Sequence, residues 1–81
     1  MISLMDAKKI VEKRFPEAKV EAAYKYTDQY YLFVAPSVEN DVNDPFYIVD
    51  IDDGKCRFLN PMEDFDAFDS ALSSTPLKKY Q

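Results

Sequence analysis

Apolar residues near the start of the chain recur every three or four positions, which is the spacing of one face of an α-helix. These residues are Leu4, Ala7, Ile10, Val11 and Phe15. Ser3 and Asp6 have the spacing of a capping box, with Asp in place of the usual Glu or Gln. Pro16 cannot continue a helix. The pattern therefore predicts a first helix over residues 4–15.

A period of two follows this helix and indicates half-buried strands. Apolar and polar side chains alternate over residues 18–26. Residues 30–35 and 46–51 are rich in the aromatic and β-branched side chains that favour strands. The sequence Asp52-Asp53-Gly54-Lys55 is a compact turn whose glycine can take a positive φ. Residues 56–59 are then predicted to form the return strand.

A second helix is predicted after the last strand. Asn60 and Glu63 occupy the positions of an N-cap and of its partner three residues later. Apolar residues then recur at helical spacing and are expected to face the core. They are Met62, Phe65, Phe68, Ala71 and Leu72. Pro76 follows this helix, and residues 75–81 are expected to form a loose C-terminal tail.

The predicted order is therefore α-β-β-β-β-α, within a single domain over residues 1–81. Short connections favour neighbouring antiparallel strands, so the simplest topology is a meander. Two amphipathic helices bury their apolar stripes most economically against one face of such a sheet. The sequence thus predicts an α+β fold with a four-stranded antiparallel sheet and both helices packed on the same face.

The charge balance of the chain narrows the range of partners. The chain has a net charge of −5. Residues 1–25 hold six bases and four acids, whereas residues 26–81 hold four bases and eleven acids. A negative field repels phosphate backbones and anionic lipid surfaces. We therefore expect no direct binding to nucleic acid or membranes. The same charge favours a protein partner with a basic surface, although a net charge of this size also serves ordinary solubility.

Cys56 is the only cysteine of the chain, so an intrachain disulfide is excluded. Secreted domains of this size usually need disulfides, which favours a reducing compartment here. The first residues lack the basic and apolar regions of a signal peptide. The longest apolar runs have the length of strands and are too short to span a bilayer. We therefore expect a cytoplasmic protein.

Most kinds of catalytic and metal site lack the residues they need in this sequence. The chain has no histidine, which excludes Ser-His-Asp and Cys-His nucleophile systems and the usual zinc ligands. The acids around Gly54 do not match an EF-hand, whether counted from Asp50 or from Asp52, and one glycine cannot build a phosphate-binding loop. We predict no catalytic residue, no cofactor, no metal ligand and no enzyme. Acids within residues 39–44 leave an irregular cation site as an alternative to a solvated turn.

Tyrosine and aspartate side chains are the candidates for partner binding. Tyr30 and Tyr31 are adjacent in a predicted strand and must face opposite sides of the sheet, so one of them would point away from helices that cover a single face. Exposed tyrosine is typical of protein interfaces, although tyrosine also packs half-buried strands. The long polar stretch of residues 36–45 is the natural binding loop. The predicted partner-binding residues are Tyr30, Tyr31, Asp41, Asp44, Asp64, Asp66 and Asp69.

The middle of the chain resembles a known family. A helix, a hairpin and an acidic loop precede the strand Phe46-Tyr47-Ile48-Val49-Asp50 and its glycine-containing turn, in the order found in small bacterial toxin-immunity proteins. Asp50 and Gly54 are the residues that match. The resemblance implies an inhibitor that binds a partner protein. Short acidic domains of this kind are also similar to those of phages and mobile elements.

Three functions are consistent with these observations. The favoured one is a protein-binding module, such as an inhibitor or immunity-type protein, that uses the tyrosine-bearing sheet face, the loop and the acidic second helix. The alternative is an acidic mimic of nucleic acid that occupies a basic protein groove. Its carboxylates would be those of Asp50, Asp52, Asp53, Asp64, Asp66 and Asp69. A metal-dependent enzyme is the least favoured, and a homodimer through exposed sheet edges remains open.

Overall fold

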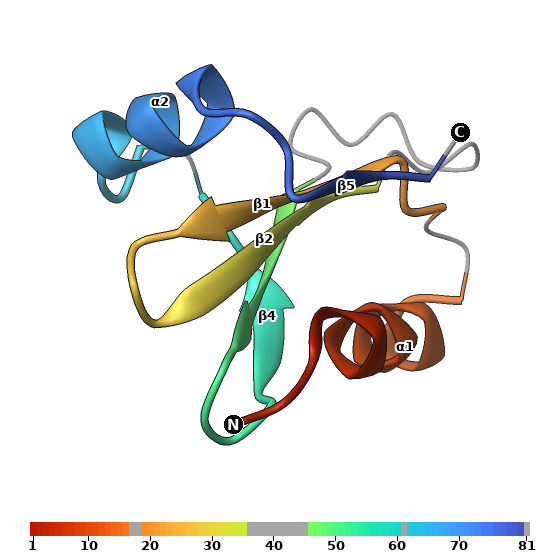
Figure 1. Cartoon of the computed structure of the whole chain (residues 1–81). Coiled ribbons are helices and arrows are strands. Elements are labelled where there is room, and N and C mark those ends of the chain that lie inside the picture. The colour runs from red at the N-terminus through yellow and green to blue at the C-terminus, as the bar shows by residue number, and fades with distance from the viewer. Residues whose placement is uncertain (17–18, 36–45, 61, 81) are drawn as a thin grey trace.

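The computed structural model describes residues 1–16, 19–35, 46–60 and 62–80, which form two helices and an antiparallel sheet (Figure 1). The fold is α+β, as the sequence predicts. The elements are α1 (Leu4–Arg14), β1 (Ala22–Tyr26), β2 (Tyr30–Val34), β3 (Phe46–Asp50), β4 (Cys56–Phe58), α2 (Phe65–Ser73) and β5 (Lys78–Lys79).

The first helix begins where its capping signal lies. The side-chain oxygen of Ser3 accepts a hydrogen bond from the backbone N–H of Asp6 at 3.1 Å, which satisfies one of the free donors of the first turn. The N–H of Phe15 donates to the carbonyl of Val11 at 2.8 Å and closes the last turn. The predicted first helix is confirmed to within one residue.

The first four strands form the predicted meander. In the described part of the chain, the strand order is β4-β3-β2-β1-β5, and each neighbouring pair is antiparallel. Tyr26 pairs with Tyr30 across the β1–β2 turn, and Tyr30 pairs with Asp50 of β3. Thr27 in that turn has a φ of 54°, which a β-branched residue seldom adopts.

The sheet has a fifth strand, where the sequence predicted four strands and a loose tail over residues 75–81. Lys78 and Lys79 pair with β1. Hydrogen bonds from the N–H groups of Leu77 and Tyr80 to β1 and the residue before it extend this pairing, with lengths of 2.7 and 2.8 Å. Two residues are too few to show an alternating pattern. The strand forms because it satisfies backbone groups at the free edge of β1.

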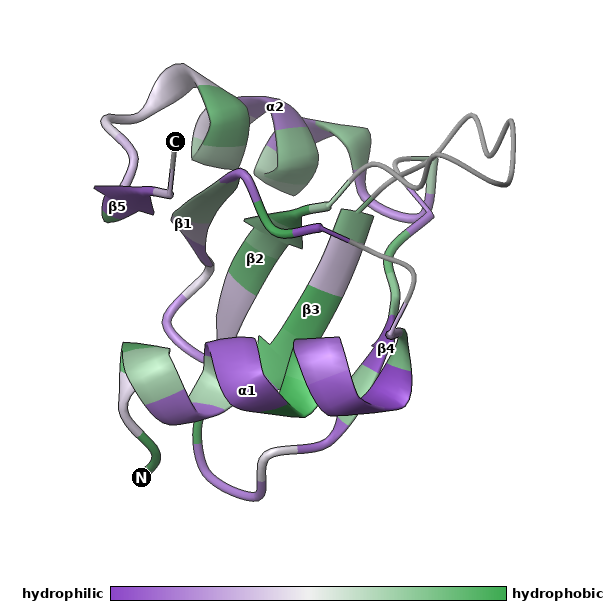
Figure 2. Cartoon of the chain, turned by 90° about the vertical axis from the view of Figure 1, so that its right-hand side faces the viewer, coloured by the Kyte–Doolittle hydropathy of each residue, from purple (hydrophilic) through white to green (hydrophobic). Residues whose placement is uncertain are grey.

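The two helices cover opposite faces of the sheet, so the prediction that both lie on one face was wrong (Figures 1 and 2). Helix α1 packs on the face of Phe33, Tyr47 and Val49. Helix α2 packs on the face of Leu32 and Ile48. The cause lies in β2 and β3, which carry apolar residues at both odd and even positions. Both faces of the sheet must therefore be removed from water.

The second helix begins later than predicted. Asp64 is its N-cap, and its carboxylate accepts a hydrogen bond from the N–H of Ala67 at 3.2 Å. Asn60 and Glu63 do make the bonds of a capping pair, because the Asn60 side chain accepts from the N–H of Met62 and Glu63 accepts from the N–H of Asn60. Residues 62–63, however, form a turn before the helix. Three members of the predicted apolar stripe pack on the sheet, namely Phe68, Ala71 and Leu72. Met62 and Phe65 do not pack on the sheet. Met62 lies before the shortened helix and Phe65 is its first residue, and both side chains are exposed.

Candidate protein-binding surfaces

Tyr30 and Tyr31 point to opposite faces of the sheet, as predicted, but neither is an unpartnered anchor. The hydroxyl of Tyr31 donates to the carbonyl of Ile2 at 3.2 Å on the α1 side of the sheet. Tyr30 lies on the α2 side, with its ring centroid 6.2 Å from that of Tyr26. Both side chains are half-buried. Their surroundings fit packing of the sheet surface, and Tyr30 also lines the groove beside β4 described below.

Two other predicted residues, Asp41 and Asp44, lie outside the described residues, as does the whole candidate loop of residues 36–45. The same holds for the alternative cation site within residues 39–44. Among the described residues, no group of three or more histidine, cysteine, aspartate or glutamate side chains is placed to hold a metal ion.

Asp50 organises the turn between β3 and β4. Its carboxylate accepts hydrogen bonds from the N–H of Asp52 at 2.8 Å, the N–H of Asp53 at 3.3 Å and the side-chain amide of Gln29 at 2.8 Å. The bond from the Asp52 N–H is the main reason that the pKa of Asp50 lies below its ordinary value. These bonds join the β1–β2 turn to the β3–β4 turn. The carboxylate of Asp50 is thus engaged within the fold.

The acids of this turn and those of α2 do not form one surface. The β3–β4 turn lies beside the N-terminus, and α2 lies apart from it over one face of the sheet, in both views (Figures 1 and 2). Within α2, Asp64 caps the helix, while Asp66 and Asp69 are exposed. The structure therefore brings together the three predicted aspartates of α2 but not the six carboxylates that a nucleic-acid mimic would need.

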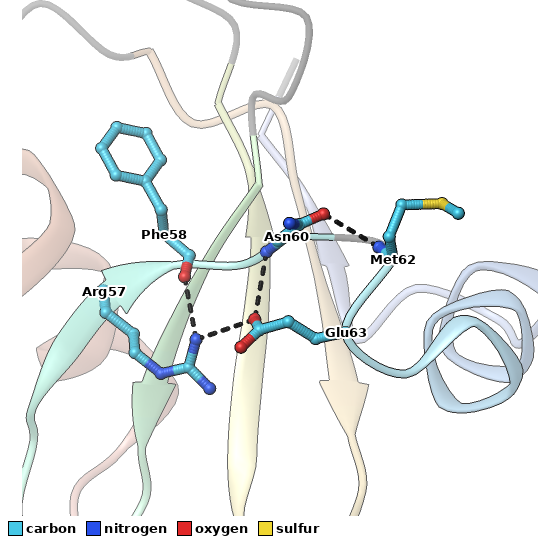
Figure 3. A network of polar contacts seen from close by, with 5 residues as sticks. All are labelled: Arg57, Phe58, Asn60, Met62 and Glu63. Atoms are coloured by element: carbon cyan, nitrogen blue, oxygen red, sulfur yellow. Dashed lines mark hydrogen bonds and ion pairs between the residues drawn. The ribbon is translucent and has the colours of Figure 1, made fainter.

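A polar network fixes the segment between β4 and α2 (Figure 3). One guanidinium nitrogen of Arg57 donates to the carbonyl of Phe58 at 3.0 Å and to the carboxylate of Glu63 at 3.1 Å. The same Glu63 oxygen accepts from the N–H of Asn60 at 3.3 Å, and the Asn60 side chain accepts from the N–H of Met62 at 2.9 Å. The Arg57 hydrogen bond lowers the pKa of Glu63. These contacts tie Glu63 to Arg57 and Asn60.

This segment displays apolar side chains among acids. Met62 is 77% exposed and Phe65 is 60% exposed. The charged neighbours are Glu63, Asp64, Asp66 and Asp69, of which Asp69 lies one helical turn after Phe65. We call these six residues the α2 entry surface. The sequence analysis predicts its three aspartates for partner binding but assigns Met62 and Phe65 to the core, because these two share the helical spacing of the core residues.

A second candidate surface is a groove of about 770 Å³ beside the edge strand β4. This groove is lined by Asp50 and by four basic residues. Two of the bases lie at the end of α1, and the other two lie in β4 and in the turn before it. The bases are Lys13, Arg14, Lys55 and Arg57. We call this space the β4 groove. Its bases are far apart in the sequence and meet only because α1 packs next to β4, so composition alone did not reveal it.

Cys56 lies in the wall of the β4 groove with a buried side chain. Burial raises the pKa of this thiol above its ordinary value, and the weaker opposing influence of Arg14 does not reverse the shift. The side chain packs with the cluster beneath α1. These features fit a buried thiol of low reactivity.

Comparison with known proteins adds no relative. No protein-family model matches the chain, and no curated protein or solved structure is significantly similar to it. Within the described residues, neither helix has the length and apolar character that crossing a membrane requires. The functional argument therefore depends on the two surfaces themselves.

Proposed function

We propose that this chain is a non-enzymatic protein-binding module that acts through the α2 entry surface, in the manner of an inhibitor or immunity-type protein. One observation carries the proposal. Met62 and Phe65 are large apolar side chains that face water although other residues of the same helical stripe are packed in the core. A partner protein would cover them.

The surroundings of these side chains resemble the anatomy of an interface. Protein interfaces place apolar residues at the centre and polar or charged residues at the rim. Here Met62 and Phe65 are bordered by acids. The hydrogen bonds among Arg57, Asn60 and Glu63 hold the segment before binding, so little ordering entropy is lost when a partner docks.

The chemistry of the rim defines the expected partner. The residues from Glu63 to Asp69 include four acids and no base. A matching surface would offer an apolar pocket surrounded by lysine or arginine side chains, and electrostatic attraction would speed the encounter. The nucleic-acid mimic is less well supported, because the acids of the β3–β4 turn lie apart from those of α2 in both views. A reducing compartment such as the cytoplasm suits the single buried thiol.

Affinity capture with matched variants tests the proposal. The tagged chain would be incubated with a lysate of the organism that encodes it, beside the double variant Met62→Ser, Phe65→Ser. The control is Met1→Ser, Met5→Ser, which removes two exposed methionines elsewhere. We expect a protein that the parent and the control both retain and the Met62/Phe65 variant loses. Retention of every captured protein by the Met62/Phe65 variant would contradict the proposal.

A further inference from the structure

Among the described residues, strand β4 is an edge of the sheet, and its outer side carries backbone groups without a strand partner. The N–H of Asp50 donates to the carbonyl of Lys55, and the N–H of Leu59 donates to the carbonyl of Phe46. Hydrogen-bonded pairs alternate in an antiparallel ladder, so Arg57 is the residue of β4 that bonds inward to β3. The N–H and C=O groups of its two neighbours therefore point outward.

These neighbours are Cys56 and Phe58. Of their four outward groups, the carbonyl of Phe58 accepts the Arg57 guanidinium. The N–H of Phe58 and both groups of Cys56 face the open edge in the described part of the chain. They form a short template on which another extended chain can pair.

The space beside this template is basic. The β4 groove contains four bases and one acid among its lining residues, in a chain whose net charge is −5. Lys55 and Arg57 lie on the α2 side of β4, because alternate residues share a face. Lys13 and Arg14 come from the last turn of α1 on the other side. Bases thus flank the open edge on both faces of the sheet.

We propose that the β4 groove binds an extended acidic segment of another protein, which adds to the sheet as a strand next to β4. The backbone of the segment accepts from the N–H groups of Cys56 and Phe58 and donates to the carbonyl of Cys56. Its side chains alternate between the two faces. Acidic side chains on one face then meet Lys13 and Arg14, and those on the other face meet Lys55, because Arg57 is already paired with Glu63.

A second copy of the chain is a poor occupant of this groove. Two β4 strands paired edge to edge would bring Lys55 and Arg57 of both copies together, and like charges across a strand pair are destabilising. The opposite edge of the sheet, β5, consists of Lys78 and Lys79 and has the same sign. Charge complementarity therefore favours an acidic partner over a homodimer.

This inference goes beyond the proposed function, because the β4 groove and the α2 entry surface have opposite charge and suit different partners. The probe is a fluorescein-labelled octapeptide of alternating glutamate and threonine, with a lysine–threonine octapeptide and a fully backbone N-methylated glutamate–threonine octapeptide as controls. Binding is measured by fluorescence anisotropy, and exchange of the Cys56 and Phe58 amide protons by nuclear magnetic resonance.

We expect the glutamate–threonine peptide to bind at low salt, to slow amide exchange at Cys56 and Phe58, and to bind about tenfold more weakly after salt is raised to 0.3 M. The double variant Arg14→Gln, Lys55→Gln should lose about tenfold in affinity at low salt. Lys9→Gln, on the exposed side of α1, should change the affinity by less than about twofold.

Three results would overturn the inference. They are absence of binding by the glutamate–threonine peptide, equal binding by the lysine–threonine peptide, and equal binding by the N-methylated peptide, which keeps the charges but cannot pair as a strand. The parent keeps an intact α2 entry surface in all of these assays. Suppose that the peptide does not bind the parent, while the Met62/Phe65 variant still loses the captured protein. This pair of results would reject the groove and leave the proposed function standing.

Discussion

Replacing Phe68 with alanine should destabilise the fold, and replacing Phe65 with alanine should not. The two residues are three positions apart in the same helix, and the sequence assigns both to the core. In the structure, the Phe68 ring packs edge-on against Phe46 with a centroid separation of 4.8 Å and an interplanar angle of 77°. Phe65 is 60% exposed.

The structure sets the size of the two effects. Removal of a fully buried phenylalanine side chain costs about 3–5 kcal/mol. Phe68 is half-buried, so about half of that loss applies, together with about 0.5–1.5 kcal/mol for the aromatic pair. We therefore expect Phe68→Ala to lower the free energy of unfolding by about 2–4 kcal/mol. Phe65→Ala should change it by less than about 1 kcal/mol, since exposed positions tolerate substitution and alanine favours helix.

Urea and thermal unfolding of the parent and both variants would measure the difference. A loss of 1 kcal/mol lowers the melting temperature of a domain of this size by roughly 4–8 °C. The Phe68→Ala variant should therefore melt at least about 8 °C below the parent, with Phe65→Ala close to the parent. Equal destabilisation by both substitutions would refute the packing of α2 described above, and an unchanged melting temperature for Phe68→Ala would refute the contact with Phe46.

Three further predictions concern the β3–β4 turn, the polar network and the thiol. Gly54→Ala should destabilise the fold by about 1–2 kcal/mol in urea unfolding, because φ is +75° there and a new Cβ would lie 3.2 Å from the Ile10 side chain; an unchanged midpoint would contradict this. Because the Arg57 hydrogen bond lowers the pKa of Glu63 below its ordinary 4.5, that carboxylate contributes stability that is present above about pH 4.5 and lost as the pH falls through the lowered pKa. Glu63→Gln should therefore flatten the fall in urea midpoint below pH 4.5, and an equally steep fall would refute the contribution. Cys56 should react with a thiol reagent at pH 8 much more slowly in the native protein than in the urea-unfolded chain, because the fold buries the thiol and raises its pKa; equally fast reaction in both states would contradict its burial.

The elements that the sequence predicts well are those with local signals. The first helix has an apolar stripe and a Ser3 cap, and the short β1–β2 and β3–β4 connections favour pairing of neighbouring strands. The sequence predicts the second helix too early because Asn60 and Asp64, four residues apart, can both cap a helix. Competition between two caps depends on packing of the helix against the sheet, which local spacing does not reveal.

The remaining differences depend on contacts between distant segments. Periodicity shows that a helix has an apolar side but not which face of a sheet it covers, and the doubly apolar strands β2 and β3 needed a helix on each face. The two-residue strand β5 has no pattern of its own. The bases of the β4 groove come from two parts of the chain that are about forty residues apart, so only the packing of α1 beside β4 reveals the groove.

The most direct test of the proposed function is the affinity of the captured partner for the purified chain, measured by isothermal titration with the parent and with the Met62→Ser, Phe65→Ser variant. Apolar residues at the centre of an interface commonly carry most of its binding energy. We predict at least a tenfold loss of affinity for the variant, with the Met1→Ser, Met5→Ser control unchanged. Equal affinities of the parent and the Met62/Phe65 variant would contradict binding through the α2 entry surface.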